Sequence, residues 1–170
     1  MNNERLEHVN MTVKNIDEVL RFLRAALPTW RVRGEGTMDW YGKPIRWLHV
    51  GTDHSYLALQ DGGEGEVPHW TSHGVGAKHL GIAVDSVDAV VERLGAAGFA
   101  LEHWAGEHPQ RRRVYVIDPG SLQFEFIEYR SALAAERNAY DVAVAGQAPQ
   151  ISVARSVGPI PVVTGRRSST

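Results

Sequence analysis

The chain has 170 residues, of which 43 % are hydrophobic and 22 % charged, and its formal net charge is −2. Such a composition is ordinary for a globular protein, and the small net charge argues against a partner that is nucleic acid or an anionic membrane. Cysteine is absent, which excludes disulfides, zinc fingers and thiolate chemistry, so any metal ligand must be histidine, carboxylate or water. The polar start of the chain and the lack of a long apolar run favour a soluble cytoplasmic protein.

The chain repeats itself, and the repeat organises the expected elements. Residues 8–26, HVNMTVKNIDEVLRFLRAA, align with residues 79–97, HLGIAVDSVDAVVERLGAA. In each copy a histidine begins a run that alternates like a strand, and a run at helical spacing follows it. The expected N-caps are Asn15 or Asp17 in the first copy and Asp85 or Ser86 in the second, and the expected helix ends are marked by Pro28 and Gly98.

Three shorter strand-like runs follow each helix, so each copy is predicted to be a βαβββ module. These runs are expected at 30–34, 45–51 and 55–60 in the first copy and at 99–104, 112–118 and 122–129 in the second. A module that cannot cover its own sheet face must stack on its twin or on another chain. The predicted fold class is therefore α+β, with two βαβββ modules forming a curved mixed sheet around a metal cavity.

A single domain is expected over residues 1–141. Its modules span about 5–60 and 76–129, and a glycine-rich linker or lid at 61–78 joins them. A helix is expected at about 131–140. Residues 142–170 contain no acidic residue and have scattered glycine and proline, which indicates an extended tail.

Three residues of the two modules form a candidate metal site. His8 and His79 hold the same place in the repeat, and Glu125 lies inside an apolar strand, where an unpaired carboxylate is costly. Two histidines and one carboxylate form the facial triad of non-haem Fe(II) oxygenases, which leaves coordination positions open. Ala58 takes the place of Glu125 in the first module, so three protein ligands are expected. The alternative is that each histidine is a strand-end residue satisfied by the backbone.

The histidine-led repeat and the segment IDPGSLQFE resemble the vicinal oxygen chelate superfamily, which includes glyoxalases, fosfomycin-resistance enzymes and type I extradiol dioxygenases. The resemblance covers about residues 5–129. A finer resemblance is to the extradiol dioxygenases, whose signature is matched by Gly106-Glu107-His108, Val114-Tyr115, Asp118-Pro119 and Glu125, with Ser121 where glycine or proline is usual.

The extradiol resemblance implies a role for each matched residue. His8, His79 and Glu125 would be the ligands of Fe(II). His54 would be an acid–base residue near bound O₂, a task that suits neutral histidine. His108 and Tyr115 would hydrogen-bond the substrate oxygens. The alternatives are a turn residue for His54, an exposed loop residue for His108 and plain strand packing for Tyr115.

Two further groups of residues carry weaker signals. Arg111 and Arg113 share the strand face of Tyr115 by alternation, and Arg113 is expected to pair with a substrate carboxylate. The alternative is that the arginine run is a solvated edge. Trp40, Trp47 and Trp104 are expected in the core rather than on a ring-stacking surface.

The function that the sequence favours is a small, single-domain, Fe(II)-dependent extradiol dioxygenase that opens a catechol with O₂. By its resemblance in size to L-DOPA 2,3-dioxygenases, its substrate would be L-DOPA or another carboxylate-bearing catechol. One alternative is a glyoxalase-like isomerase or lyase, or a thiol transferase like the fosfomycin-resistance enzymes. Another is a metal-free binding protein that sequesters a small molecule. The sequence leaves open whether the chain forms a homodimer, and whether both modules of one site come from one chain.

Overall fold

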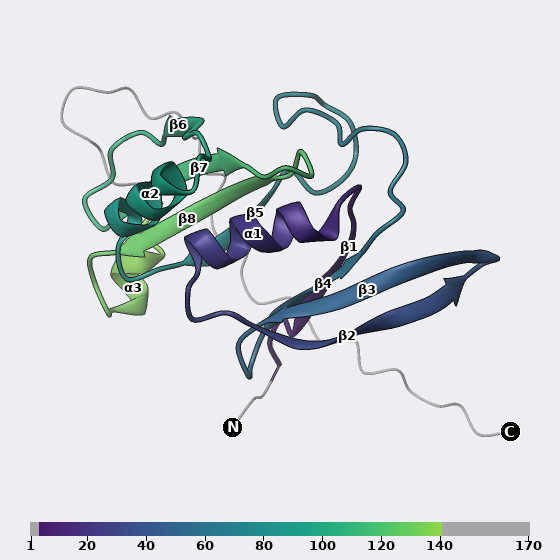
Figure 1. The fold of residues 1–170 in the computed structure, drawn as a ribbon. Coiled ribbons are helices and arrows are strands. Elements are labelled where there is room, and N and C mark those ends of the chain that lie inside the picture. Colours follow the sequence, from purple (N-terminus) through teal and green to yellow (C-terminus); the bar gives the residue numbers. More distant parts are fainter. Residues whose placement is uncertain (1–3, 141–170) are drawn as a thin grey trace, which may run out of the picture.

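A computed structural model of the protein describes residues 4–140 (Figure 1). The first module comprises β1 (His8–Thr12), α1 (Ile16–Ala26), β2 (Arg31–Trp40), β3 (Lys43–Gly51) and β4 (Tyr56–Gln60). The second comprises β5 (His79–Ala83), α2 (Val87–Ala96), β6 (His103–Trp104), β7 (Arg111–Ile117) and β8 (Gln123–Tyr129), and α3 (Ala134–Arg137) follows it. The predicted α+β class and its two βαβββ modules are confirmed. The tail expected at 142–170 lies outside the described residues.

Each module builds its own four-stranded mixed sheet. The strand orders are β1-β4-β3-β2 and β5-β8-β7-β6, and in each sheet the first and last strands of the module pair in parallel. The registers match, because Asn10 pairs with Ala58 in one sheet and Gly81 pairs with Glu125 in the other. Ala58 and Glu125 are therefore equivalent positions, as the repeat predicts. No strand pairing joins the two sheets among the described residues, so the chain has two sheets rather than one continuous curved sheet.

The helix ends follow from local capping. The side chain of Asn15 accepts hydrogen bonds from the backbone amides of Asp17 and Glu18, and Ser86 Oγ accepts one from the amide of Ala89. These contacts satisfy amides that the first helical turn leaves without partners. Helix α2 is followed by Gly98, whose φ of 82° is the left-handed conformation that glycine adopts without strain.

Three elements differ in length from the sequence-based expectation. Strand β2 continues to Trp40 and forms with β3 a long hairpin that projects from the rest of the molecule (Figure 1). Strand β6 has only two residues, because after the amide of Ala105, which still bonds to Arg113, the chain leaves the sheet. Helix α3 has four residues rather than ten, since no side chain caps its start and none of its residues is buried.

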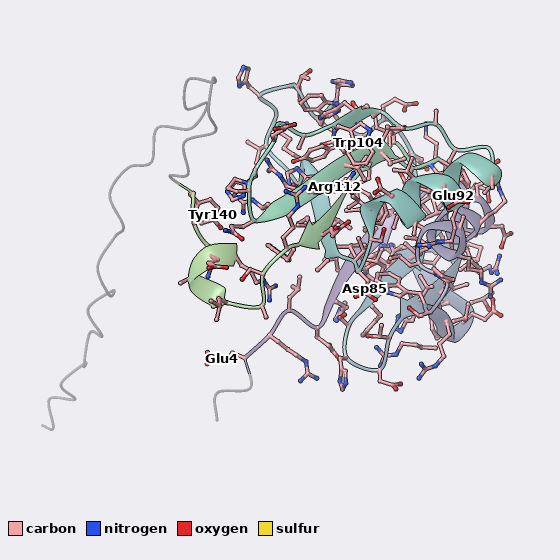
Figure 2. The ribbon with its side chains drawn as sticks, turned by 90° about the vertical axis from the view of Figure 1, so that its left-hand side faces the viewer. Glu4, Asp85, Glu92, Trp104, Arg112 and Tyr140 are labelled. Carbon is pink, nitrogen blue, oxygen red and sulfur yellow. The ribbon has the colours of Figure 1, made fainter. Side chains whose placement is uncertain are left out.

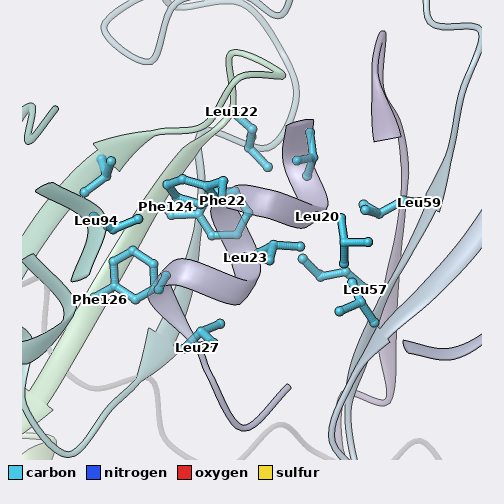
Figure 3. Close-up of a cluster of buried hydrophobic side chains, with 14 of the residues drawn as sticks. Leu20, Phe22, Leu23, Leu27, Leu57, Leu59, Leu94, Leu122, Phe124 and Phe126 are labelled. Atoms are coloured by element: carbon cyan, nitrogen blue, oxygen red, sulfur yellow. The ribbon is translucent and has the colours of Figure 1, made fainter. Parts of the chain in front are cut away.

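Helix α1 lies between the two sheets and forms the centre of the core (Figures 1 and 3). Leu20 and Leu23 face the leucines of β4, whereas Phe22 faces β8 (Figure 3). The Phe22 ring is fully buried, with its centroid 5.2 Å from that of Phe124. Each sheet therefore buries one face toward α1 and leaves its other face open.

The open face of each sheet carries the polar residues of its strands. In β1, Val9 and Met11 pack against the core, whereas His8 is exposed, and β5 repeats this pattern with His79 exposed. The expectation that three tryptophans lie in the core is wrong. Trp40 and Trp104 are 43 % and 44 % exposed, and Trp47 is half-buried on the open face of the first sheet, outside the core cluster. Between residues 4 and 140 the chain forms no helix with the length and apolarity that crossing a membrane requires.

Asp118 gives the fold a pH dependence that can be measured. Burial raises its pKa to about 6, against an ordinary value of 3.8, although the amide of Leu122 donates a hydrogen bond to its Oδ1. The native state therefore holds the proton more tightly than the unfolded state, so this group's contribution to stability is complete below pH 3.8 and is lost as the pH rises through 6. Asp118→Asn keeps the acceptor and removes the charge. We expect its free energy of unfolding to exceed that of the wild type by about 1–3 kcal/mol at pH 7.5, and by less at pH 5.

Denaturant unfolding of both proteins at the two pH values measures this difference. The exposed carboxylate of Asp85 is the control, because Asp85→Asn removes a charge that costs no burial. If the difference in free energy of unfolding between wild type and Asp118→Asn were the same at pH 5 and pH 7.5, the raised pKa of Asp118 would be contradicted.

Candidate metal and substrate site

Glu125 is the buried polar centre of the open face of the second sheet. It is 8 % exposed, and its two carboxylate oxygens have different partners. Oε1 accepts a hydrogen bond of 2.7 Å from the Tyr115 hydroxyl and lies 3.5 Å from Nη1 of Arg113. Oε2 lies 3.2 Å from Nε2 of His79. The carboxylate is thus compensated on both sides, and we call Glu125, His79, Tyr115 and Arg113 the Glu125 cluster.

Strand pairing places the members of this cluster together. Tyr115 of β7 lies directly opposite Glu125 of β8, and Gly81 of β5 lies on the other side of Glu125. Alternation then brings His79 and Arg113, each two residues away, onto the same face. The neighbouring Arg112 points to the opposite face, where it pairs with Asp88 of α2.

Tyr115 remains a hydrogen-bond donor over the whole neutral range. Burial, followed by its hydrogen bond to Glu125, raises its pKa to about 12. Its hydroxyl proton is directed at Glu125, which leaves the lone pairs of the oxygen free to accept a hydrogen bond from a ligand.

His79 and Glu125 fit two positions of a metal site. Donor atoms that bind one ion at about 2.1 Å and at right angles are about 3.0 Å apart, which is close to the separation of His79 Nε2 and Glu125 Oε2. The imidazole nitrogen and the carboxylate are both ligands that Fe(II) accepts. Tyr115 would not bind the metal itself. It would orient the carboxylate of Glu125 by its hydrogen bond to Oε1, the oxygen that does not face His79.

His8 has the surroundings of a ligand but lies in the other module. Its Nδ1 is 2.9 Å from Glu7 Oε2, and since a carboxylate only accepts, Nδ1 carries the hydrogen and the lone pair of Nε2 is left open. Metal-bound histidines commonly donate their second N–H to a carboxylate in this way. The His8 ring stacks on the Tyr56 ring, with 4.8 Å between the ring centroids.

The structure does not bring His8 to the other two predicted ligands. Within residues 4–140, no group of three or more histidine, aspartate or glutamate side chains could hold one metal ion. His8 lies on the open face of the first sheet and His79 on that of the second, each on the far side of its sheet from α1. Two of the three predicted ligands are therefore adjacent, and the third is separate.

The two remaining predicted catalytic histidines lie in loops. His54 is exposed in the turn between β3 and β4, where its amide donates to Thr52 Oγ1, and it is at the same end of the first sheet as His8. His108 is half-buried. Its Nδ1 accepts from the amide of Gln110, so Nε2 carries the hydrogen and donates to the carbonyl of Ala139 at 3.0 Å. Burial lowers the pKa of His108, which favours its neutral form.

Two groups of aromatic residues lie near the site, and the sequence analysis did not predict their contacts. On the second sheet, Trp70 of the linker stacks on His103, and His103 stacks on Tyr115. The linker is thus anchored against the open face rather than free. On the first sheet, His49 and Tyr56 join His8 in a line of ring contacts. Burial lowers the pKa of His49, and nearby Arg33 adds to the effect. The alternation of IRWLHVG could have placed His49 on the open face.

Comparison with known proteins agrees with this architecture. The family model of the Glyoxalase/Bleomycin resistance protein/Dioxygenase superfamily matches residues 5–126. Among solved structures, a glyoxylase/bleomycin resistance protein/dioxygenase domain from Frankia sp. EAN1pec has a TM-score of 0.60 at 24 % identity, over 76 % of this chain and 100 % of its own. A search of curated proteins finds no match.

Two fosfomycin resistance proteins called FosX are also similar in fold. The protein from Mesorhizobium loti has a TM-score of 0.57 at 19 % identity, over 79 % of this chain and 96 % of its own. The protein from Listeria monocytogenes, crystallised with Mn(II) and sulfate, has a TM-score of 0.56 at 16 % identity, over 81 % of this chain and 98 % of its own. With the paired modules and the family match over residues 5–126, these findings show that the chain belongs to the glyoxalase/bleomycin resistance protein/dioxygenase superfamily.

Proposed function

We propose that the protein is a non-haem Fe(II) extradiol dioxygenase that opens the ring of a catechol, with L-DOPA or another carboxylate-bearing catechol as substrate. The observation that carries the proposal is the position of His79 and Glu125, whose facing donor atoms are 3.2 Å apart with Tyr115 beside them. When bound, Fe(II) would hold the two catechol oxygens next to O₂ and let electrons pass from the ring to oxygen. That a relative of the same fold was crystallised with Mn(II) supports a divalent metal in this protein.

The residues of the Glu125 cluster divide the other tasks. His79 and Glu125 supply two ligands. Tyr115 keeps its proton at neutral pH, directs it at Glu125 and can accept a hydrogen bond from a catechol hydroxyl, which positions the ring. Arg113 offsets the charge of Glu125 and has further N–H groups to offer an acidic substrate.

The third ligand in this proposal is His8 of a second copy of the chain, so the active form is a homodimer. Phe22 is buried between α1 and β8, and facing the two open sheets toward each other within one chain would break this contact. A second copy can present its first sheet to the Glu125 cluster without unpacking either core. It would bring His54 as well, because His54 lies at the same end of that sheet as His8.

We expect iron-loaded protein to consume O₂ with a catechol and to give a yellow ring-opened product. Oxygen-electrode and absorbance measurements with L-DOPA, 4-methylcatechol and catechol test this expectation. Glu125→Ala is the control. It removes a ligand, so its metal affinity should fall by more than the roughly 10–100-fold that loss of an outer partner costs. Binding of catechols without any oxygen uptake would favour the isomerase or the metal-free binding protein instead.

A mixture of two inactive variants tests the shared site. In a homodimer of the proposed kind, His8→Ala and Glu125→Ala damage different halves of each site. Co-expressed with different tags, half of the dimers are mixed and each mixed dimer has one intact site of two, so about one quarter of wild-type activity should return.

The matched control is a mixture of His79→Ala with Glu125→Ala. Both residues belong to the same half of the site, so no mixed dimer is intact and no activity should return. Failure of the first mixture to regain activity, with both variants folded and dimeric, would place the whole site in one chain.

His54→Gln tests the acid–base role. Glutamine keeps the size and one hydrogen bond of histidine but cannot exchange a proton near neutral pH. We expect kcat to fall by about 10²–10⁴-fold, the usual contribution of such a residue, while iron and catechol binding are retained. His73→Gln, which changes an exposed histidine of the linker, should leave kcat unchanged. Turnover by His54→Gln within about threefold of wild type would exclude the role.

A further inference from the structure

A pocket of about 570 Å³ lies beside the Glu125 cluster, where the loop that follows Ala105 leaves β7. Strand β6 is too short to cover this part of β7, so the loop forms the opposite wall. Trp104 and Arg112 lie close together at this edge of the sheet (Figure 2), with the guanidinium of Arg112 5.3 Å from the centre of the ring. Arg113 belongs both to the pocket and to the Glu125 cluster, so the pocket adjoins the cluster at this residue.

The pocket is strongly cationic. Its lining includes Arg111, Arg112, Arg113 and Arg130 and one carboxylate, Glu107, which is exposed. Of the arginines of β7, Arg112 is already neutralised, because both of its Nη atoms bond to the carboxylate of Asp88 at 2.6 and 2.8 Å. Arg111 has no acidic partner among the described residues. It donates a long hydrogen bond of 3.5 Å to the carbonyl of Arg137 and lies over the Tyr140 ring.

Two buried donors in this pocket have no acceptor. In the described part of the chain, only three buried side-chain polar atoms lack a hydrogen-bond partner, and two of them are Nε of Arg111 and Nε of Arg113. An unsatisfied buried donor typically costs about 1–3 kcal/mol and more when it is charged, so a pair of them in one pocket calls for an explanation. An anion that enters the pocket would compensate the charge of both guanidiniums, and it would supply the missing acceptor to any Nε that turns toward it.

The spacing of the two donors fits a single acidic group. Arg111 and Arg113 are two residues apart on one strand, so their side chains leave the same face about 7 Å apart along the strand. A guanidinium can offer two of its N–H groups as a fork that matches the two oxygens of a carboxylate. We propose that Arg111 and Arg113 together bind the carboxylate of an aromatic acid in this pocket, with its ring directed toward Glu125.

This inference rests on the proposed function for the identity of the ring, and it adds the recognition of the acid. The main contact to the substrate carboxylate is then Arg111, whose charge is uncompensated. Arg113 contributes less, because it already pairs with Glu125. The substrate class is then a catechol that carries its carboxylate on a short side chain, because the pocket adjoins the cluster through Arg113.

Binding can be measured without turnover. Full-length protein is titrated anaerobically with 3-phenylpropanoate and with 3-phenylpropan-1-ol, which have the same ring and chain length but differ in the acid. Quenching of tryptophan fluorescence reports occupancy, since Trp104 lines the pocket, and calorimetry checks the affinity. We expect the wild type to prefer the acid by tenfold or more, about the effect of one charge-assisted hydrogen bond. Arg111→Gln should lose this preference.

Arg112→Gln is the matched control. It removes the same charge one residue away, but its guanidinium is held by Asp88, so it should keep the preference for the acid. If both variants lost the preference for the acid equally, the overall positive charge of the pocket would bind the anion, and the specific role of Arg111 would be wrong. A wild type that binds acid and alcohol equally well would overturn the proposal by itself. Selectivity for the acid without oxygen uptake would retain the pocket and reject the dioxygenase, whereas oxygen uptake without selectivity would do the reverse.

Discussion

The contact between Phe22 and the second sheet determines the arrangement of everything else. Its ring, fully buried, contacts Phe124 on one side and Phe99 on another, so α1 belongs to both modules at once. Removing such a ring from a core typically costs about 3–5 kcal/mol, a large part of the stability of a small domain. The open sheet faces are held apart by this packing, and with them the two halves of the candidate site.

The Glu125 cluster shows how a costly residue is kept in an apolar strand. A buried carboxylate without partners would destabilise the sheet, but three side chains compensate it: Tyr115 with a neutral donor, and His79 and Arg113 with nitrogen atoms. The same contacts fix the direction of both carboxylate oxygens. These contacts keep Glu125 Oε2 and the imidazole of His79 facing each other. A pair of metal ligands requires such preorganisation.

Much of the fold could be predicted from local sequence rules. The repeat predicted both modules, Asn15 and Ser86 were among the expected capping residues, and strand alternation placed Arg113 on the face of Tyr115. These features depend on residues a few positions apart. The extent of β2 and the brevity of β6 were not predicted, because they depend on pairing partners rather than on the strand's own sequence.

The relation between the modules could not be predicted, for a physical reason. The repeat requires each sheet to find cover, but a twin module and a second chain provide it equally well, and only the shape of the packed core decides between them. The same limit explains the tryptophans. Trp40 and Trp104 were expected in the core, but they lie on the edge strands β2 and β6 and are exposed. The stacking of Trp70 on His103 likewise joins segments that have no common pattern.

Ala58 and Glu125 occupy equivalent positions, yet only one of them carries a charge. The two modules repeat one strand order and register, and a site with identical halves would accept a two-oxygen ligand in either sense. With methyl on one side and carboxylate, phenol and guanidinium on the other, the two senses are no longer equal in energy. The difference between Ala58 and Glu125 thus makes the site asymmetric, so that the two sides of a ligand placed there would meet different surroundings.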